Sequence, residues 1–209
     1  MTARSVPGFE GSPTESQAGP PAPSAPSDGA GGRRRPPATD LVARSTITLE
    51  AQQSRVALLL AAAVGDDRWQ AALRPEDRQR LVRLGHFSDY ATELDWTVGD
   101  VAGHLRDSAC IFSDRLRRMC SERQPQLADF VTDAPERLAD YRSTSPRELL
   151  RQLRRAQDDL RQTVAGVGIT DLGRTGLHVV DGRISVAEVL DFLPRHQLDH
   201  AEQLAAQLR

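Results

Sequence analysis

Four long stretches of the chain carry apolar residues at every third or fourth position. They are residues 49–64, 98–119, 146–164 and 186–208, and this spacing places the apolar side chains on one face of an α-helix. A shorter amphipathic stretch, residues 75–84, predicts a minor helix, and the rest of the connection between residues 64 and 98 is predicted to be loop. No alternation of apolar and polar residues competes with these helices, so the pattern predicts an all-α fold.

Local signals mark where three of these helices begin. Thr97 with Asp100, and Ser185 with Glu188, have the spacing of a capping box, and Ser145 precedes a proline at the first helical position. Four helices that each have one apolar face predict a four-helix bundle. The long connections before and after residues 98–119 leave room for a crossover, so loop length allows an up-down-down-up order.

The beginning of the chain has a different composition. The first forty residues hold eight of the thirteen prolines and six of the fifteen glycines. Such a segment has too little apolar surface to offset the entropy of ordering, so we predict a disordered tail over residues 1–45 and a bundle domain over 46–209. The arginines at 33–35 are followed by prolines rather than an apolar run, which argues against a twin-arginine export signal.

The amino-acid composition excludes several classes of function and partner. A net charge of −2 argues against nucleic acid or an anionic membrane as partner. All 27 basic residues are arginine, which excludes a P-loop lysine and a Schiff-base lysine and is typical of a high-GC bacterial genome. Cys110 and Cys120 would lie about 15 Å apart along one helix, beyond disulfide reach. The absence of a Cys-x-x-Cys motif favours a reducing cytoplasm.

Three histidines are candidate metal ligands. His196 and His200 continue the apolar stripe of residues 186–208, and two side chains four apart share one helix face. His104 lies beside the stripe of residues 98–119. If these two helices face each other, three neutral imidazoles converge, a set that binds Zn, Ni or Fe(II) and leaves coordination positions open.

The histidines also have interpretations other than metal binding. A lone histidine on an apolar face is more often a hydrogen-bonded core residue than a ligand, and only the coincidence of two favours a metal. Gln197 stands where a helical zinc protease carries its glutamate base, which excludes that class. Asp107 and Asp199 are candidates to orient the ligands from a second layer. No Ser–His–Asp order or glycine-rich phosphate loop occurs.

Three segments resemble the DinB-like (YfiT-like) superfamily: residues 96–105, 112–116 and 195–204. The resemblance implies an up-down-down-up bundle with a divalent metal on His104, His196 and His200. Members with known roles include metal-dependent thiol transferases acting with bacillithiol or mycothiol, a mycothiol-dependent isomerase, and enzymes of sulfur-containing natural products. Pro194, inside the last helix, departs from commoner members. It frees the carbonyl of Leu190 and predicts a kink before the histidine pair.

The leading hypothesis is a metal-dependent transferase that conjugates a mycothiol-type thiol to an electrophilic small molecule, in detoxification or natural-product biosynthesis. Arg106 and Arg195 are candidates to bind an anionic substrate, and His178, on a glycine-rich loop over residues 166–183, is a candidate for the rim. The alternatives are a non-catalytic protein that binds a metal or sequesters a small molecule, and a site without activity. A homodimer is compatible with the sequence, which contains no motif for an oligomeric state.

Overall fold

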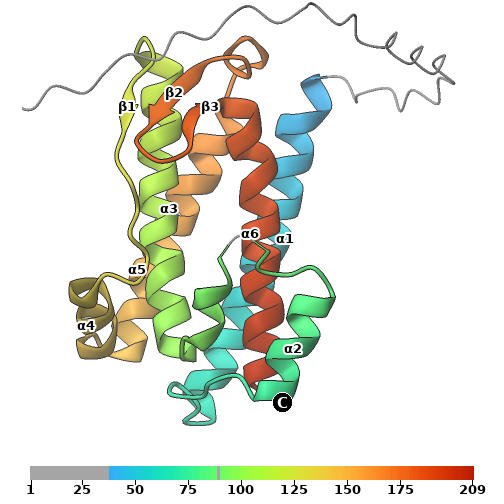
Figure 1. The fold of residues 1–209 in the computed structure, drawn as a ribbon, viewed down its shortest axis with the longest axis vertical. Helices are drawn as coiled ribbons and strands as arrows, with labels where there is room; N and C mark the ends of the chain where they lie inside the picture. The colour runs from blue at the N-terminus through green and yellow to red at the C-terminus, as the bar shows by residue number, and fades with distance from the viewer. Residues whose placement is uncertain (1–37, 89) are drawn as a thin grey trace, which may run out of the picture. The chain divides into compact units, whose positions relative to one another are not determined.

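The computed structural model describes residues 38–88 and 90–209, which lie in one compact unit. Four long helices form this unit: α1 (Ala38–Gly65), α3 (Val98–Ser121), α5 (Pro146–Ala165) and α6 (Val186–Gln207) (Figure 1). Both predicted capping boxes are present, and the Ser145 side chain caps α5. The four-helix fold predicted from the apolar spacing is therefore confirmed. The predicted tail up to residue 37 lies outside the described residues.

The bundle has the up-down-down-up order. α1 and α6 lie side by side and run in the same direction, as do α3 and α5 (Figure 1). α1 also packs against α5, and α3 against α6. The chain therefore returns along the bundle between α3 and α5, by way of β1 (Gln126–Leu127) and α4 (Pro135–Ser143). α4 can lie close to α3 because Gly103 has no side chain. A Cβ there would lie 2.2 Å from the ring of Tyr141.

The smaller elements lie at the two ends of the bundle. α2 (Pro75–Arg83) and the 3-10 helix η1 (Ala91–Asp95) precede α3, and the 3-10 helix η2 (Ile169–Asp171) follows α5. β2 (Thr175–His178) lies between β1 and β3 (Gly182–Ser185), parallel to the first and antiparallel to the second.

The loop predicted over residues 166–183 thus contains η2, β2 and the start of β3. Strands of two to four residues are too short to show an alternating pattern. Gly176 further weakens the strand signal in β2, because a glycine contributes no side chain to an apolar–polar pattern. The structure needs glycine here, since Leu127 fills the space and a Cβ at Gly176 would lie 2.5 Å from that leucine.

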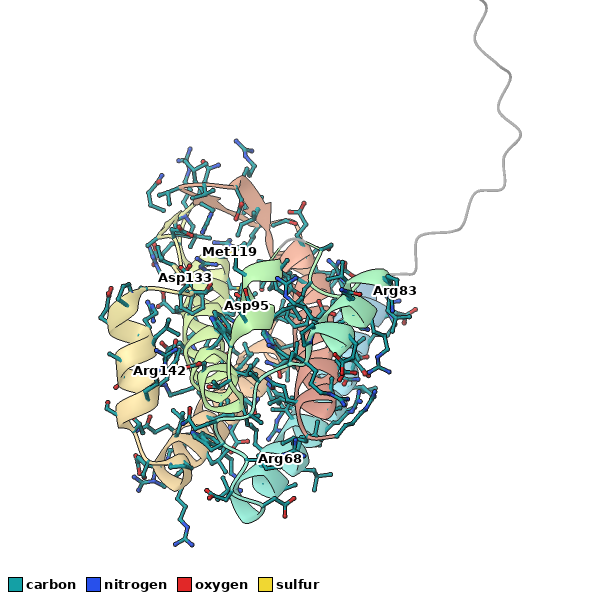
Figure 2. All side chains as sticks on the ribbon, turned by 60° about the horizontal axis from the view of Figure 1, so that its bottom comes forward. Arg68, Arg83, Asp95, Met119, Asp133 and Arg142 are labelled. Carbon is teal, nitrogen blue, oxygen red and sulfur yellow. The ribbon has the colours of Figure 1, made fainter. Side chains whose placement is uncertain are left out.

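The core runs between the four helices, and each contributes fully buried side chains, among them Leu49, Leu60, Leu105, Leu116, Leu160, Leu190 and Leu204. At one end, Arg68 ties the segment after α1 to the end of α6 (Figure 2). Its guanidinium donates to the carbonyl oxygens of Gln207 and Leu208 at 2.7 and 2.6 Å. Within the described part of the chain, no helix is long and apolar enough to cross a membrane.

The first helix begins earlier than the spacing predicts. α1 starts at Ala38 rather than at residue 49, so residues 38–45, predicted to belong to the tail, are helical. The β-branched run at residues 46–48 disfavours helix by local propensity, which hides this first part of α1 in the sequence. Leu41 and Val42 pack against the core, and Ser45 is buried against α6, so tertiary contacts outweigh that preference.

Ser45 also accounts for Pro194. α6 continues as helix through Pro194, which cannot donate to the carbonyl of Leu190. The Ser45 hydroxyl donates to that carbonyl oxygen instead, at 2.7 Å. A side chain of α1 therefore replaces the backbone hydrogen bond that Pro194 removes, in the part of α6 just before the histidine pair.

Replacing Ser45 by alanine is expected to destabilise the protein by about 1–3 kcal/mol, because the buried carbonyl of Leu190 loses its donor. The free energy of unfolding from urea titration measures this. The matched background is Pro194→Ala, which restores a backbone N–H to position 194. There, Ser45→Ala should cost less than in the wild type, and equal costs in the two backgrounds would contradict this role of Ser45.

Candidate metal centre

Four buried side chains meet between α3, α6 and η1. His104 comes from α3, His196 and His200 from α6, and Glu93 from η1. One nitrogen of each histidine and one oxygen of Glu93 lie within 4.8 Å of one another. The structure therefore brings together the three histidines named from the sequence and adds a carboxylate that was not among the candidates.

Gln203 sets the orientation of His200. Its Nε2 donates to the backbone oxygen of Glu93 at 2.7 Å, so its Oε1 faces His200 Nδ1 at 2.9 Å. Since an amide oxygen only accepts, His200 donates from Nδ1 and its Nε2 carries a lone pair in the neutral ring. That lone pair faces Glu93 Oε2, another acceptor, at 3.2 Å. Two acceptor atoms this close repel each other unless a cation or a shared proton lies between them.

The other two imidazoles extend this set of donor atoms. His104 Nε2 lies 2.9 Å from His196 Nε2 and 3.8 Å from Glu93 Oε2. His200 Nε2 and Glu93 Oε2 are buried without a hydrogen-bond partner in the described structure. Native proteins rarely leave such atoms unpaired. Three imidazole nitrogens and a carboxylate oxygen suit a Zn, Ni or Fe(II) ion, so the residues present fit a divalent metal.

Burial controls the charge of the cluster. It lowers the pKa of His104 and of His196 well below the usual histidine range, and the neighbouring His200 adds to both shifts. Both rings are therefore neutral near pH 7, the form that binds a metal.

The stability of the metal-free protein is expected to fall as the pH drops below about 6.5. Unfolded histidines bind protons there, whereas His104 and His196 do not while the protein is folded. Each contributes a slope of up to about 1.4 kcal/mol per pH unit. Urea titrations of chelator-treated protein between pH 7 and 5 measure this slope. The double variant His104→Asn/His196→Asn should flatten it, and an unchanged slope would contradict the assignment.

Aromatic rings enclose the three histidines. Trp96 lies 4.8 Å from His104 between ring centroids, and Phe130 stacks on the same ring at 5.6 Å. Phe192 stacks on His196 at 5.2 Å. These rings keep water from the donor atoms and lower the local dielectric, which strengthens any charge interaction inside.

Comparison with known proteins agrees with this architecture. A family model for the DinB superfamily matches residues 48–204, about three quarters of the chain. The chain belongs to the DinB superfamily. No curated protein matches it. Among solved structures, YfiT from Bacillus subtilis is similar, with a TM-score of 0.62, 16% identity, and coverage of 79% of this chain and 85% of YfiT. YfiT is described as a probable metal-dependent hydrolase with an unusual four-helix bundle topology. At this identity the likeness shows the fold.

In this DinB-superfamily chain, Asp199 fastens the segment before η1 to α6. Its carboxylate contacts His86 Nδ1 at 2.7 Å, the Phe87 N–H at 3.3 Å and the Tyr90 hydroxyl at 2.5 Å. Burial and the bond to Asp199 raise the pKa of Tyr90, so its hydroxyl stays protonated. The rings of Phe87 and Tyr90 in turn contact His200. Asp199 therefore acts on the cluster through aromatic neighbours rather than by a hydrogen bond to His104, His196 or His200.

The structure places Asp107 and Arg106 in the packing of α4 rather than in the cluster. Asp107 accepts from Arg137 and from the Tyr141 hydroxyl, both in α4. Arg106 donates to Asp107, to Asp140 in α4 and to Gln152 in α5. Among the described residues, neither has a hydrogen bond or ion pair with a histidine of the cluster.

Arg195 and His178 are also outside the cluster. Arg195 is exposed and pairs with Asp191 one turn earlier. His178 is buried in β2 instead of lying on a loop, with its Nε2 3.0 Å from Arg115 Nη2. These contacts attach the hairpin of β2 and β3 to α3.

Glu93 is the functional candidate that sequence reasoning missed. It lies in a stretch predicted as loop, and no helical spacing relates it to the histidines. Glu93 is only 3% exposed, but no pattern in the neighbouring sequence marks it as buried. Only the packing of η1 across α3 and α6 gives this carboxylate its neighbours.

Proposed function

We propose that this protein is a metal-dependent enzyme that transfers a low-molecular-weight thiol to an electrophilic small molecule. The observation that carries the proposal is the unpaired carboxylate oxygen of Glu93 among three buried imidazoles. A protein that only stores a metal needs nothing beyond the ligands. An enzyme also needs a group that accepts a proton, and the Glu93 carboxylate beside the three imidazoles can do this.

Each residue of the cluster has a role in this scheme. His104, His196 and His200 would hold a divalent ion, and the ion when bound lowers the pKa of a thiol or water at its open position. Glu93 takes the proton from the thiol, whose sulfur forms a bond to the electrophilic carbon while the leaving group departs with its electron pair. The same proton then passes from Glu93 to a basic leaving group, or to solvent where the leaving group is a halide, which balances the reaction. Gln203 keeps His200 in the required tautomer.

The thiol in this scheme comes from a substrate. Cys110 is exposed on α3 and Cys120 is half-buried near its end. Partial desolvation raises the pKa of both thiols. Neither belongs to the cluster. The partly exposed rings of Tyr90, Phe130 and Phe192 border the cluster, and we assign substrate entry to this aromatic side.

A hydrolase is the second candidate, because YfiT is described as a probable metal-dependent hydrolase. Glu93 would then take a proton from water rather than from a thiol. Both reactions would use the same histidine cluster and the same base, Glu93. Thiol transfer and hydrolysis can therefore be distinguished only by testing which substrates the protein converts.

Thiol consumption tests the proposal. Metal-loaded protein mixed with mycothiol and a chlorodinitroarene is expected to deplete free thiol and form the conjugate at least about 100-fold faster than the chelator-treated protein. Conjugate formation followed by mass spectrometry separates transfer from oxidation of the thiol. Ester and amide hydrolysis is followed in parallel. Hydrolysis without conjugation would favour the hydrolase, and turnover in neither assay would favour the binding protein.

A further inference from the structure

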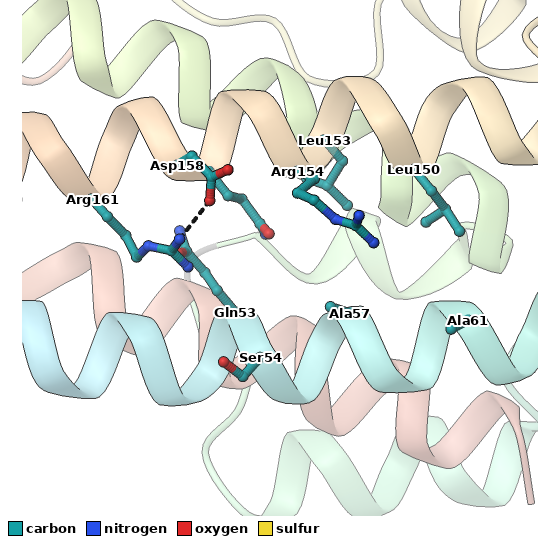
Figure 3. A pocket seen from close by; sticks show the side chains of 10 residues that line it. Gln53, Ser54, Ala57, Ala61, Leu150, Leu153, Arg154, Asp158 and Arg161 are labelled. Atoms are coloured by element: carbon teal, nitrogen blue, oxygen red, sulfur yellow. Dashed lines mark hydrogen bonds and ion pairs between the residues drawn. The ribbon is translucent and has the colours of Figure 1, made fainter.

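A groove lies between α1 and α5 (Figure 3). The histidine cluster lies between the other two long helices, α3 and α6. The volume of the groove is about 240 Å³. Its walls include polar and apolar side chains of both helices, among them Gln53, Ala57, Ala61, Leu150, Arg154 and Gln157. None of them takes part in the proposed transfer reaction.

Two glutamines in this groove have unpaired amide groups. Gln53 is 1% exposed, and neither its Nε2 nor its Oε1 has a hydrogen-bond partner in the described structure. Gln157 is 5% exposed and its Nε2 is likewise unpaired. Figure 3 shows Gln53 rising from α1 towards α5. Because buried amides of native proteins almost always have partners, these atoms point to a polar occupant. The occupant must offer both a hydrogen-bond acceptor and a donor.

The charges of the groove indicate the sign of that occupant. Arg161 is paired with Asp158, as the dashed line in Figure 3 marks. Arg154 lines the groove without an ion pair or hydrogen bond to any described residue. An unpaired guanidinium on the wall of the same groove favours a carboxylate.

The remaining wall is apolar. Ala57 and Ala61, one turn apart on α1, face Leu150 on α5 across the groove (Figure 3). Small side chains on α1 leave room for a branched aliphatic group, which the leucine would contact.

We propose that the groove between α1 and α5 binds an N-acylated aliphatic amino acid, or the C-terminal residue of a peptide, which has the same chemistry. The carboxylate pairs with Arg154. The amide N–H donates to Gln53 Oε1, and the acyl oxygen accepts from Gln157 Nε2. The aliphatic side chain packs on Ala57 and Ala61.

Titration with N-acetyl-L-leucine, followed by calorimetry and amide NMR shifts, tests the site in the full-length protein. Saturable binding is expected, with N-acetyl-L-leucinamide binding at least about tenfold more weakly because it lacks the carboxylate. A tripeptide ending in free leucine distinguishes the sources, since tighter binding of the peptide favours a polypeptide C-terminus. No saturable binding at millimolar concentration, or equal affinity for the acid and the amide, would overturn the proposal and leave a groove that holds water only.

Two variants sharpen the test. Gln53→Leu is expected to weaken binding at least about tenfold and, at the same time, to raise the melting temperature of the ligand-free protein, because it removes an unpaired buried amide. A purely structural glutamine would lower the melting temperature instead. Arg154→Gln should remove the preference for acid over amide. Its control is Arg151→Gln, on the same helix but paired with Glu148 and outside the groove, which should bind like the wild type. Wild-type affinity in Gln53→Leu would contradict the site.

Discussion

Replacing His196 by alanine is expected to lower divalent metal affinity by more than about 100-fold and to abolish turnover. His196 Nε2 lies 2.9 Å from His104 Nε2, so removing the ring takes one of three converging nitrogens from the centre. Loss of an outer hydrogen-bond partner already costs about 10–100-fold in metal affinity, and loss of a ligand should exceed it. Elemental analysis after dialysis and competition with a chelating dye measure the change.

The control for this experiment is His178→Gln. It alters another buried histidine, in β2 and outside the cluster. This variant should keep the metal content of the wild type once its folded fraction is taken into account. Equal metal affinity in His196→Ala and wild type would remove the three-histidine centre from consideration. A wild-type protein that binds no divalent ion would support a site without activity.

Replacing Glu93 by glutamine is expected to keep the metal and to lose the reaction. Glutamine has nearly the same shape as glutamate, but its amide cannot accept a proton from a thiol or water. General-base catalysis contributes about 10²–10⁴-fold, so kcat should fall by that factor. Three imidazoles remain, and metal content should stay at the wild-type level. Steady-state rates on metal-saturated protein, with metal content measured on the same samples, separate the two effects.

Asp95→Asn is the matched change for Glu93→Gln. Asp95 lies in the same 3-10 helix, but its side chain is 70% exposed and pairs with Arg78. Its removal should leave both rate and metal content unchanged. If Glu93→Gln lost the metal as well as the rate, Glu93 would be a fourth ligand. If the variant kept the rate of the wild type, the base would have to be another group.

Helix positions followed from the sequence because their signals are local. The apolar spacing and the two capping boxes act within one or two turns, and the helices α3, α5 and α6 begin at the predicted residues. α1 is the exception. Its first turns depend on the contact between Ser45 and Leu190, 145 positions away, so spacing and propensity placed its start too late.

The residues of the candidate metal centre likewise divide into those whose positions depend on one helix and those whose positions depend on tertiary packing. The register of His196 and His200 on α6, and of His104 beside the stripe of α3, could be read from periodicity, since each position depends only on its own helix. The positions of Arg106 and Arg195 relative to the cluster could not be read in this way. Being close in sequence to a histidine does not place an arginine on the same helix face.

The sequence by itself determined four amphipathic helices, their caps and three inward-facing histidines, because hydrophobic periodicity and capping are properties of neighbouring residues. The tertiary structure alone decided that Glu93 joins the histidines, that Ser45 replaces the hydrogen bond lost at Pro194, and that Gln53 is buried beside a groove. Each of these depends on segments far apart in the chain. Their meeting is set by how the helices pack, which no local pattern encodes.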